Sequence, residues 1–325
     1  MSQGRCWKSA LVVGMLVFGS VNTLTKKFQM ESCGKSIMGR TSEDAEGRQL
    51  CPKGEEKFSK PWSQNIMMFI GEGFLITLMC CQRRPTLPVD DSDAKNEESP
   101  HAPFYIFGIP ALCDVIGTGI GGIGMLFVSA AVWQMMRGSI IIFTSVFSVF
   151  FLQKTLYLYH WLAVLVSVCG ISMVGTSAFM NEGVGGSGSN ILFGIACIML
   201  AQVFAAFQMI TEELFVKGYG TPPAQVVGSE GMWGMFYMVV LLTTFYLVPG
   251  QDNGSYENFS DTVYKVIQSP YPLDVWCLAY LVSIGIYNFL GVSMAGQLSS
   301  VHRTLVDALR TAMVWLVELA IFYGT

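Results

Sequence analysis

The chain has 325 residues, of which 52% are hydrophobic and 13% are charged, and its mean hydropathy is +0.49. This composition is too apolar for a soluble globular protein. The net charge of −4 comes with no basic patch, aromatic RNA-binding motif or zinc-finger spacing, which argues against nucleic acid as a partner. Apolar runs of about 20 residues, enough to cross a hydrocarbon core of roughly 30 Å, recur along the chain. The composition therefore predicts a polytopic, all-α membrane protein that has the lipid bilayer as its surroundings.

The apolar runs predict nine transmembrane helices in chain order. The first run lacks a small-residue cleavage site and is followed by many others, so we interpret it as a retained helix and not as a signal peptide. The loop at 29–60 contains Cys33 and Cys51, an acidic loop covers 83–103, and 183–189 is a Gly/Ser hinge. The predicted helices cover residues 7–28, 62–82, 104–128, 130–152, 156–179, 190–216, 225–248, 273–298 and 302–323.

Two features predict which loops face the lumen. Asn253 and Asn258 each begin an Asn-x-Ser glycosylation sequence in the loop between the seventh and eighth helices. A disulfide between Cys33 and Cys51 would also need an oxidising compartment. Nine alternating helices place both loops on the same side. We therefore expect that side to be lumenal and the N-terminus to be cytosolic.

The two halves of the chain resemble each other at three places. Residues 71–73 match 229–231, residues 19–23 match 205–209, and residues 136–138 match 309–311. These matches imply a repeat of five helices, and an odd number inverts the second copy, as in many secondary transporters. The first repeat would cover 1–180 and the second 190–325. The repeat also predicts a tenth helix after residue 325, so nine of ten helices would be present.

Polar residues inside the predicted helices are the candidate solute site. A charge at bilayer depth costs from a few to more than about ten kcal/mol, so it persists only where it faces a protein interior or a wet cavity. Asp307 and Arg310 share one helix face by their spacing, and the repeat relates Arg137 to Arg310. The alternative is that such charges only pair across helices, and this reading is favoured for Glu72, Glu230, Arg303 and Glu318. The candidate residues are Asn22, Asp114, Gln134, Arg137, Gln208, Glu212, Asp307 and Arg310.

Motifs for enzymatic chemistry are not supported by their context. Residues 119–124 match the dinucleotide-binding pattern G-x-G-x-x-G, but they lie within a predicted helix and follow no strand. We interpret these glycines, with Gly117, as a surface where helices pack closely. Asp114 follows Pro-Ala-Leu-Cys, yet the second aspartate element of an intramembrane protease does not occur. The three histidines lie in loops or at predicted membrane edges, so the sequence predicts no metal site, no cofactor and no enzyme.

A group of motifs resembles a known family. They are Gly-Ser-Val-Asn-Thr-Leu at 19–24, Ala-Leu-Cys-Asp-x-x-Gly-Thr at 111–118, Gln-Met-Met-Arg-Gly-Ser-Ile-Ile-Ile-Phe-Thr at 134–144, Glu-Glu-x-Phe at 212–215, Val-Gly-Ser-Glu-Gly at 227–231 and Leu-Arg-Thr at 309–311. Together they are similar to the F branch of solute carrier family 35, in the drug/metabolite transporter superfamily. That superfamily also holds nucleotide-sugar transporters and chloroquine-resistance-transporter-like proteins.

The resemblance carries several expectations. It implies ten helices in two inverted repeats, cytosolic termini, alternating access, and an endomembrane location that is lysosomal or Golgi, with a mitochondrial association also open. The chain departs from the pattern in lacking the tenth helix and in its longer first loop with two cysteines.

The sequence is compatible with two classes of function. The first is a secondary transporter of a small polar organic solute. Acids outnumber bases in the predicted spans, so coupling of transport to protons is one hypothesis. A homodimer is a further possibility that the sequence does not decide. The alternative is a non-transporting membrane scaffold or receptor that keeps the transporter fold.

Overall fold

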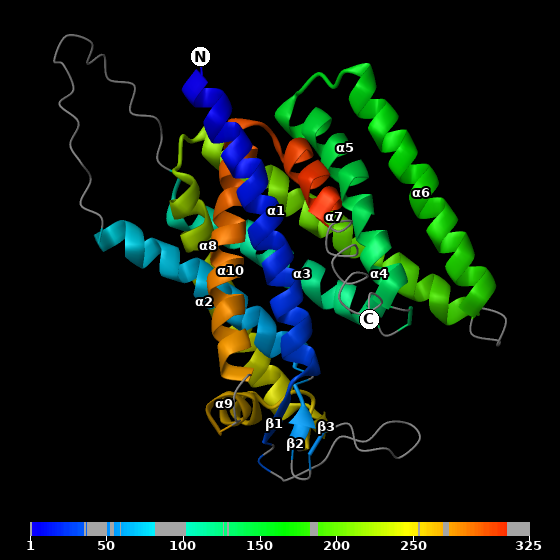
Figure 1. Ribbon diagram of the computed structural model, residues 1–325, viewed down its shortest axis with the longest axis vertical. Coiled ribbons are helices and arrows are strands. Elements are labelled where there is room, and N and C mark those ends of the chain that lie inside the picture. The colour runs from blue at the N-terminus through cyan, green and yellow to red at the C-terminus, as the bar shows by residue number, and fades with distance from the viewer. Residues whose placement is uncertain are drawn as a thin grey trace, which may run out of the picture. The chain divides into compact units, whose positions relative to one another are not determined.

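The computed structural model describes residues 2–35, 37, 51–52, 55–58, 60–81, 102–125, 127–128, 130–182, 188–252, 254–268 and 273–310. Within these ranges almost all regular structure is α-helical (Figure 1). Of the helices in these described ranges, five are long and apolar enough to cross a membrane, and they cover Cys6–Lys26, Phe104–Gly124, Ile191–Gly218, Pro223–Leu247 and Leu273–Gln297. The predicted fold class, an all-α polytopic membrane bundle, is confirmed.

Helices occur at every predicted position, although the last is described only at 300–310. The helices are α1 (Ser2–Glu31), α2 (Pro61–Cys81), η1 (Phe104–Phe107), α3 (Gly108–Met125), α4 (Ala130–Met136), η2 (Arg137–Ser139), α5 (Ile140–Leu152), α6 (Leu158–Glu182), α7 (Gly188–Gly218), α8 (Pro223–Leu247), α9 (Phe259–Gln268) and α10 (Leu273–Gln297). The strands are β1 (Cys33–Lys35), β2 (Glu55–Lys57) and β3 (Pro249–Asp252).

The chain divides into two compact units. Unit 1 comprises 1–71, 234–287 and 305–325, and unit 2 comprises 72–233 and 288–304. The divisions fall within α2, α8 and α10, and each unit takes residues from both of the repeats expected from the sequence. Compact units and sequence repeats are different divisions of a chain, so the repeat division at 180–190 stays a prediction.

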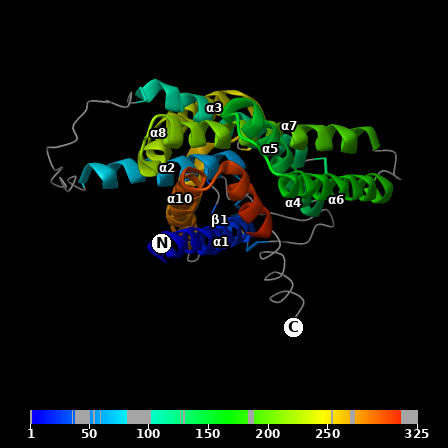
Figure 2. The same cartoon turned by 90° about the horizontal axis from the view of Figure 1, so that it is seen from above.

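Unit 2 is built around α7, which packs along α3 and against α5. Figure 2 shows α4, α5 and α6 grouped with α7. Small residues allow the close approach of α3 and α7: a β-carbon built on Gly124 would lie 2.9 Å from the carbonyl oxygen of Gly194, and one on Gly117 would lie 3.3 Å from that of Ala201. The glycines at 117–124 thus provide a surface for helix packing, as such small residues do in membrane proteins.

Unit 1 carries a small cap that the sequence did not predict. β1 and β2 form an antiparallel pair in which Cys33 lies opposite Lys57, and α9 packs against β1. Figure 1 shows α9 and the three strands gathered at one end of this unit. The cap joins the loop after α1 to the loop after α8, so these two loops lie on the same side of unit 1.

A disulfide between Cys33 and Cys51 closes a segment of the cap, with a sequence separation of 18 residues. Closing a loop of this size restricts the unfolded chain and stabilises a fold by about 3 kcal/mol in the chain-entropy model. We expect Cys33→Ser to lower the stability of the cap by this order. Limited proteolysis of the purified protein should show faster cleavage near residues 33–58, and an unchanged pattern would contradict a stabilising role for the disulfide.

Two local features differ from the expected helices. The predicted helix at 130–152 is interrupted by a 3-10 turn at Arg137–Ser139, which separates α4 from α5. Helix α9 lies where the sequence predicted only a loop. Its ten residues include Asp261 and Lys265 and are far too few to cross a bilayer, so no membrane helix was expected there.

Candidate functional site

Unit 2 gathers acidic side chains from four helices. Glu212 of α7 accepts a hydrogen bond from Gln208 at 3.1 Å, and Gln208 also bonds Asp114 of α3. Thr118 donates to Asp114 at 3.2 Å. Asp114 and Glu212 repel each other and also repel Glu72 of α2 and Glu230 of α8. We call Glu72, Asp114, Glu212 and Glu230 the acid cluster.

One guanidinium group faces the acid cluster. Arg303, which is 4% exposed, forms an ion pair with Glu212 through its Nη1. Its positive charge also attracts the carboxyl groups of Glu72, Asp114 and Glu230. A β-carbon on Gly291 of α10 would lie 2.7 Å from Nε of Arg303. Any larger residue at this position would clash with the guanidinium of Arg303, so glycine provides the space that this group fills.

Glu213 follows Glu212 directly but belongs to a different network. Its carboxylate forms ion pairs with Lys154, in the segment between α5 and α6, and with Lys217, at 2.6 Å. The backbone N–H of Ser300 also donates to it at 2.8 Å. Among the residues that the structure describes, two cations thus pair with Glu213, whereas the acid cluster shares Arg303.

Unit 1 contains a second buried charge group, which we call the arginine site. Arg310 is 6% exposed and forms an ion pair with Asp307 at 2.8 Å. It donates to the Gly19 carbonyl at 3.2 Å and to the Thr23 hydroxyl at 2.7 Å, both on α1. Its guanidinium lies 5.2 Å from the ring centre of Tyr287, and the Tyr287 hydroxyl donates to Asp307. Asp307 and Arg310 therefore share one face, as their spacing predicted.

The remaining candidate residues lie in separate surroundings. Arg137 is partly buried in η2 of unit 2, where it lies 5.2 Å from the ring of Trp133. Asn22 is 8% exposed in α1 of unit 1, and its side-chain oxygen has no hydrogen-bond partner in the described part of the chain. The side chain of Gln134 falls outside the described residues. Unit 2 thus unites Asp114, Gln208 and Glu212, and unit 1 unites Asp307 and Arg310.

The list of candidate residues omitted three residues that complete these groups, although the sequence had already indicated that Arg303 pairs across helices. Tyr287 contacts both members of the arginine pair. Arg303 pairs with Glu212, and Asn288 donates to Glu72. The spacing of Arg303 from Asp307 and Arg310 indicates a shared helix side, which is the signal that could have included Arg303 among the site residues.

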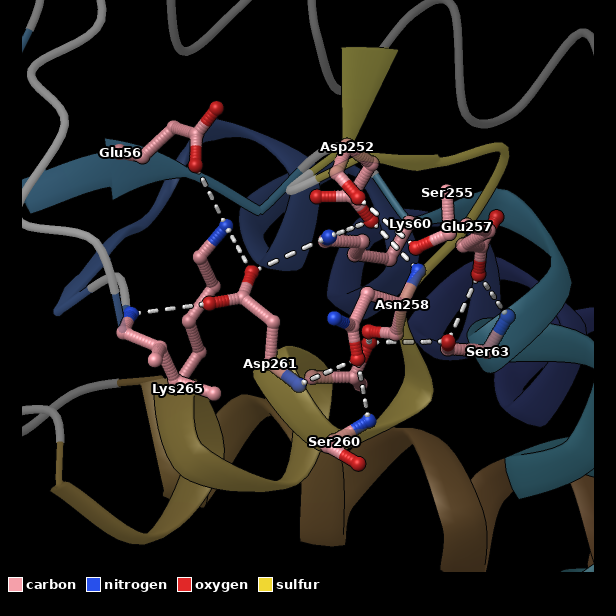
Figure 3. A network of polar contacts seen from close by, with 12 residues as sticks. Glu56, Lys60, Ser63, Asp252, Ser255, Glu257, Asn258, Ser260, Asp261 and Lys265 are labelled. Atoms are coloured by element: carbon pink, nitrogen blue, oxygen red, sulfur yellow. Dashed lines mark hydrogen bonds and ion pairs between the residues drawn. The ribbon is translucent and has the colours of Figure 1, made fainter. Parts of the chain in front are cut away.

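A third polar network holds the cap together (Figure 3). Lys60 forms ion pairs with Asp252 and Asp261, the latter at 3.1 Å. Lys265 forms ion pairs with Asp261 and Glu56, both at 2.9 Å. These ion pairs join residues from β2, α9, β3 and the start of α2. The network therefore fixes the two loops of the cap to each other.

A residue of the cap, Glu257, also binds the N-terminal turn of α2. The Glu257 carboxylate accepts hydrogen bonds from the backbone N–H groups of Trp62 and Ser63 and from the Ser63 hydroxyl (Figure 3). A carboxylate is favoured at a helix N-terminus because the unpaired N–H groups and the helix dipole attract it. Burial nevertheless raises the pKa of Glu257, since it disfavours the ionised form more than these bonds favour it.

Asp261 makes the cap sensitive to acid. Burial alone would raise its pKa, but the Ile37 N–H and the two lysines together hold the pKa below the usual value. A carboxyl with a lowered folded pKa stabilises the fold above its unfolded pKa of about 3.9, and that stabilisation is lost as the pH falls through the folded value. We expect the cap to lose protection against protease below about pH 4. Asp261→Asn should weaken the cap at neutral pH and flatten this acid dependence, so an equally steep dependence in both proteins would contradict the assignment.

The long apolar helices and the charged groups buried between them define the class of this molecule. It is an integral, multi-pass α-helical membrane protein. No family model matches the chain.

Comparison with individual proteins, in contrast, shows the family to which the chain belongs. The chain is 33% identical over 319 residues to solute carrier family 35 member F6 of Homo sapiens, covering 94% of this chain and 80% of that protein. The protein of the same name from Rattus norvegicus is 34% identical over 323 residues, with the same coverage. An uncharacterized protein of Schizosaccharomyces pombe is 27% identical over 316 residues, covering 95% and 89%. The chain belongs to solute carrier family 35, and the resemblance found in its motifs is confirmed. Membership in a family of solute carriers points to a transporter and not to an enzyme.

Proposed function

We propose that the protein is a secondary transporter that moves a small polar organic solute across an endomembrane by alternating access. The observation that carries the proposal is the arginine site, in which Arg310 is buried and Asp307 is partly buried among apolar helices. Charged residues within membrane helices are costly and mark solute or ion pathways by default. Binding at the bilayer midplane, where two repeats meet, is the usual arrangement in such transporters.

The proposal assigns a role to each kind of side chain. Arg310 and Arg137 would bind an anionic or hydrogen-bond-accepting group of the solute, because a guanidinium presents several donors in fixed geometry. Carboxylates and amides would bind donor groups of the solute, so the solute is expected to carry both kinds. The proposed solute-binding residues are Asn22, Asp114, Gln134, Arg137, Gln208, Glu212, Asp307 and Arg310.

The proposal is tested with purified full-length protein in proteoliposomes. Vesicles with wild-type protein should accumulate at least one compound from a broad panel of labelled polar metabolites. Arg137→Ala should reduce that uptake. If no compound moves and Arg137→Ala is equally silent, while both proteins remain folded, the protein is a scaffold or receptor and the proposal fails.

We also propose that the cap faces the lumen of the organelle, lysosomal or Golgi, and that Asn258 carries a glycan. The Asn258 side-chain oxygen accepts bonds from the N–H groups of Ser260, at 3.0 Å, and Asp261, at 3.3 Å, and so caps α9. This arrangement engages the side-chain oxygen, and the glycan would attach to the nitrogen. The other predicted site, Asn253, lies outside the described residues. Glycosidase should increase the mobility of the wild-type protein and not that of Asn253→Gln/Asn258→Gln. Labelling of the cap by a reagent confined to the cytosol would contradict this orientation.

A further inference from the structure

The acid cluster holds more negative charge than its surroundings compensate. Glu72, Glu212 and Glu230 are 4%, 1% and 4% exposed, and Asp114 is partly buried beside them. With every group ionised, the four carboxylates and Arg303, the cation that faces them in the described part of the chain, leave a net charge of minus three. An uncompensated buried charge is so unfavourable that the group neutralises instead. At least one of these carboxyls must therefore be neutral in the folded protein.

Glu230 is the member with the fewest hydrogen-bond partners. Thr118 and Gln208 donate to Asp114, Asn288 donates to Glu72, and Arg303 binds Glu212. Oε1 of Glu230, in contrast, is buried and has no hydrogen-bond partner in the described part of the chain. Glu72, Asp114 and Glu212 all repel it, and Arg303 attracts it. Glu230 is thus the carboxyl that gains most from losing its charge.

A proton satisfies this group better than a metal ion does. No set of three His, Cys, Asp or Glu side chains among the described residues has the arrangement of a metal site. The carboxylates instead come from α2, α3, α7 and α8 and bind different donors. Neutralisation by a proton requires only that H⁺ from the aqueous phase adds to one carboxylate oxygen, which lowers the charge of the cluster by one.

We propose that Glu72, Asp114, Glu212 and Glu230 form a proton-binding site, with Glu230 as its principal acceptor and Arg303 as the fixed counter-charge. The charged and polar groups that face it are those four acids, Gln208, Asn288, Thr118 and Arg303. On the proposed transport function, which this extension requires, that proton couples solute movement to the proton gradient.

Infrared spectroscopy of the purified full-length protein tests the site without any solute. Protonated carboxyls give a carbonyl stretch that moves to lower frequency in D₂O, whereas exposed carboxylates, with a pKa of about 4, are ionised at neutral pH. The wild-type protein should retain this band at neutral pH and lose it at alkaline pH. Glu230→Gln should lose a large part of the band, and Glu72→Gln serves as the second variant where Glu230→Gln does not fold. Asp274→Asn, which alters an exposed acid at the start of α10, should leave the band unchanged.

Each other outcome counts against the proposal. A wild-type spectrum without the band at neutral pH would show that no buried carboxyl holds a proton. A band of unchanged intensity in folded Glu230→Gln would remove Glu230 as the acceptor. A band that disappears when sodium chloride replaces choline chloride would assign the cluster to a sodium ion. Since none of these readings depends on transport, a proton site can be present even where the proposed transport fails, and the two failures remain distinguishable.

Discussion

Replacing Arg310 by alanine is expected to lower the free energy of unfolding by about 3–5 kcal/mol, the usual cost of removing one partner of a buried ion pair. The change removes the contacts of Arg310 with Asp307, Thr23 and the Gly19 carbonyl. It removes the guanidinium that pairs with the Asp307 carboxylate and keeps the hydrogen bond from the Tyr287 hydroxyl. Transport should be lost as well, because Arg310 is a proposed solute ligand. Thermal unfolding in detergent and uptake into proteoliposomes measure the two effects separately.

Two further variants separate charge from geometry at this position. Arg310→Lys keeps the positive charge but presents a single ammonium group, which cannot reproduce the several directed bonds of the guanidinium. Its stability and uptake should lie between those of wild type and Arg310→Ala. The matched control is Leu309→Ala, since Leu309 is the neighbouring residue and is 60% exposed. Wild-type stability in Arg310→Ala would contradict the buried ion pair.

Replacing Gly231 by alanine is expected to destabilise the crossing of α2 and α8 in unit 2 by roughly 3 kcal/mol, the upper part of the range for overpacked sites. A β-carbon on Gly231 would lie 2.3 Å from the backbone nitrogen of Gly73 and 2.8 Å from the carbonyl carbon of Glu72. Backbone atoms cannot rotate away as a flexible side chain can, so the helices must separate. The separation would also move Glu72 and Glu230 of the acid cluster.

Gly122→Ala is the matched control for this prediction. Nothing lies within 4 Å of a β-carbon built on Gly122 of α3, and alanine is favoured over glycine in a helix by about 1 kcal/mol. Thermal unfolding should therefore show a lower midpoint for Gly231→Ala and an equal or higher midpoint for Gly122→Ala. Equal destabilisation by both changes would contradict the prediction, because helix propensity favours alanine at both positions and the close approach exists only at Gly231.

The periodic features of the sequence were the ones that predicted the structure well. Long apolar runs identified the positions of the membrane helices, because crossing a bilayer demands length and hydrophobicity that few other structures need. The spacing of Asp307 and Arg310 placed both on one helix face, because residues three apart are neighbours on a helix. These inferences depend only on local geometry, so a single sequence contains them.

Contacts between distant segments were not predictable in the same way. Tyr287 and Thr23 meet Arg310 from other helices, and no spacing in the sequence relates them. The sequence favoured a structural role for Glu72 and Glu230, because their depth was unclear and their facing helices were unknown. The cap was missed because α9 is short and β1 and β2 contain three residues each, which gives no recognisable periodicity.

We propose that this member of solute carrier family 35 moves a small polar organic solute through a route that includes Arg310. A metabolite-wide comparison of endomembrane vesicles that contain wild-type protein, Arg310→Ala, Leu309→Ala or no copy of the protein tests this proposal. At least one polar organic solute should differ between vesicles with wild-type protein and vesicles without it. Leu309→Ala should match wild type, and Arg310→Ala should match the vesicles that lack the protein. Identical metabolite profiles in all four, with the wild-type protein present and folded, would contradict it.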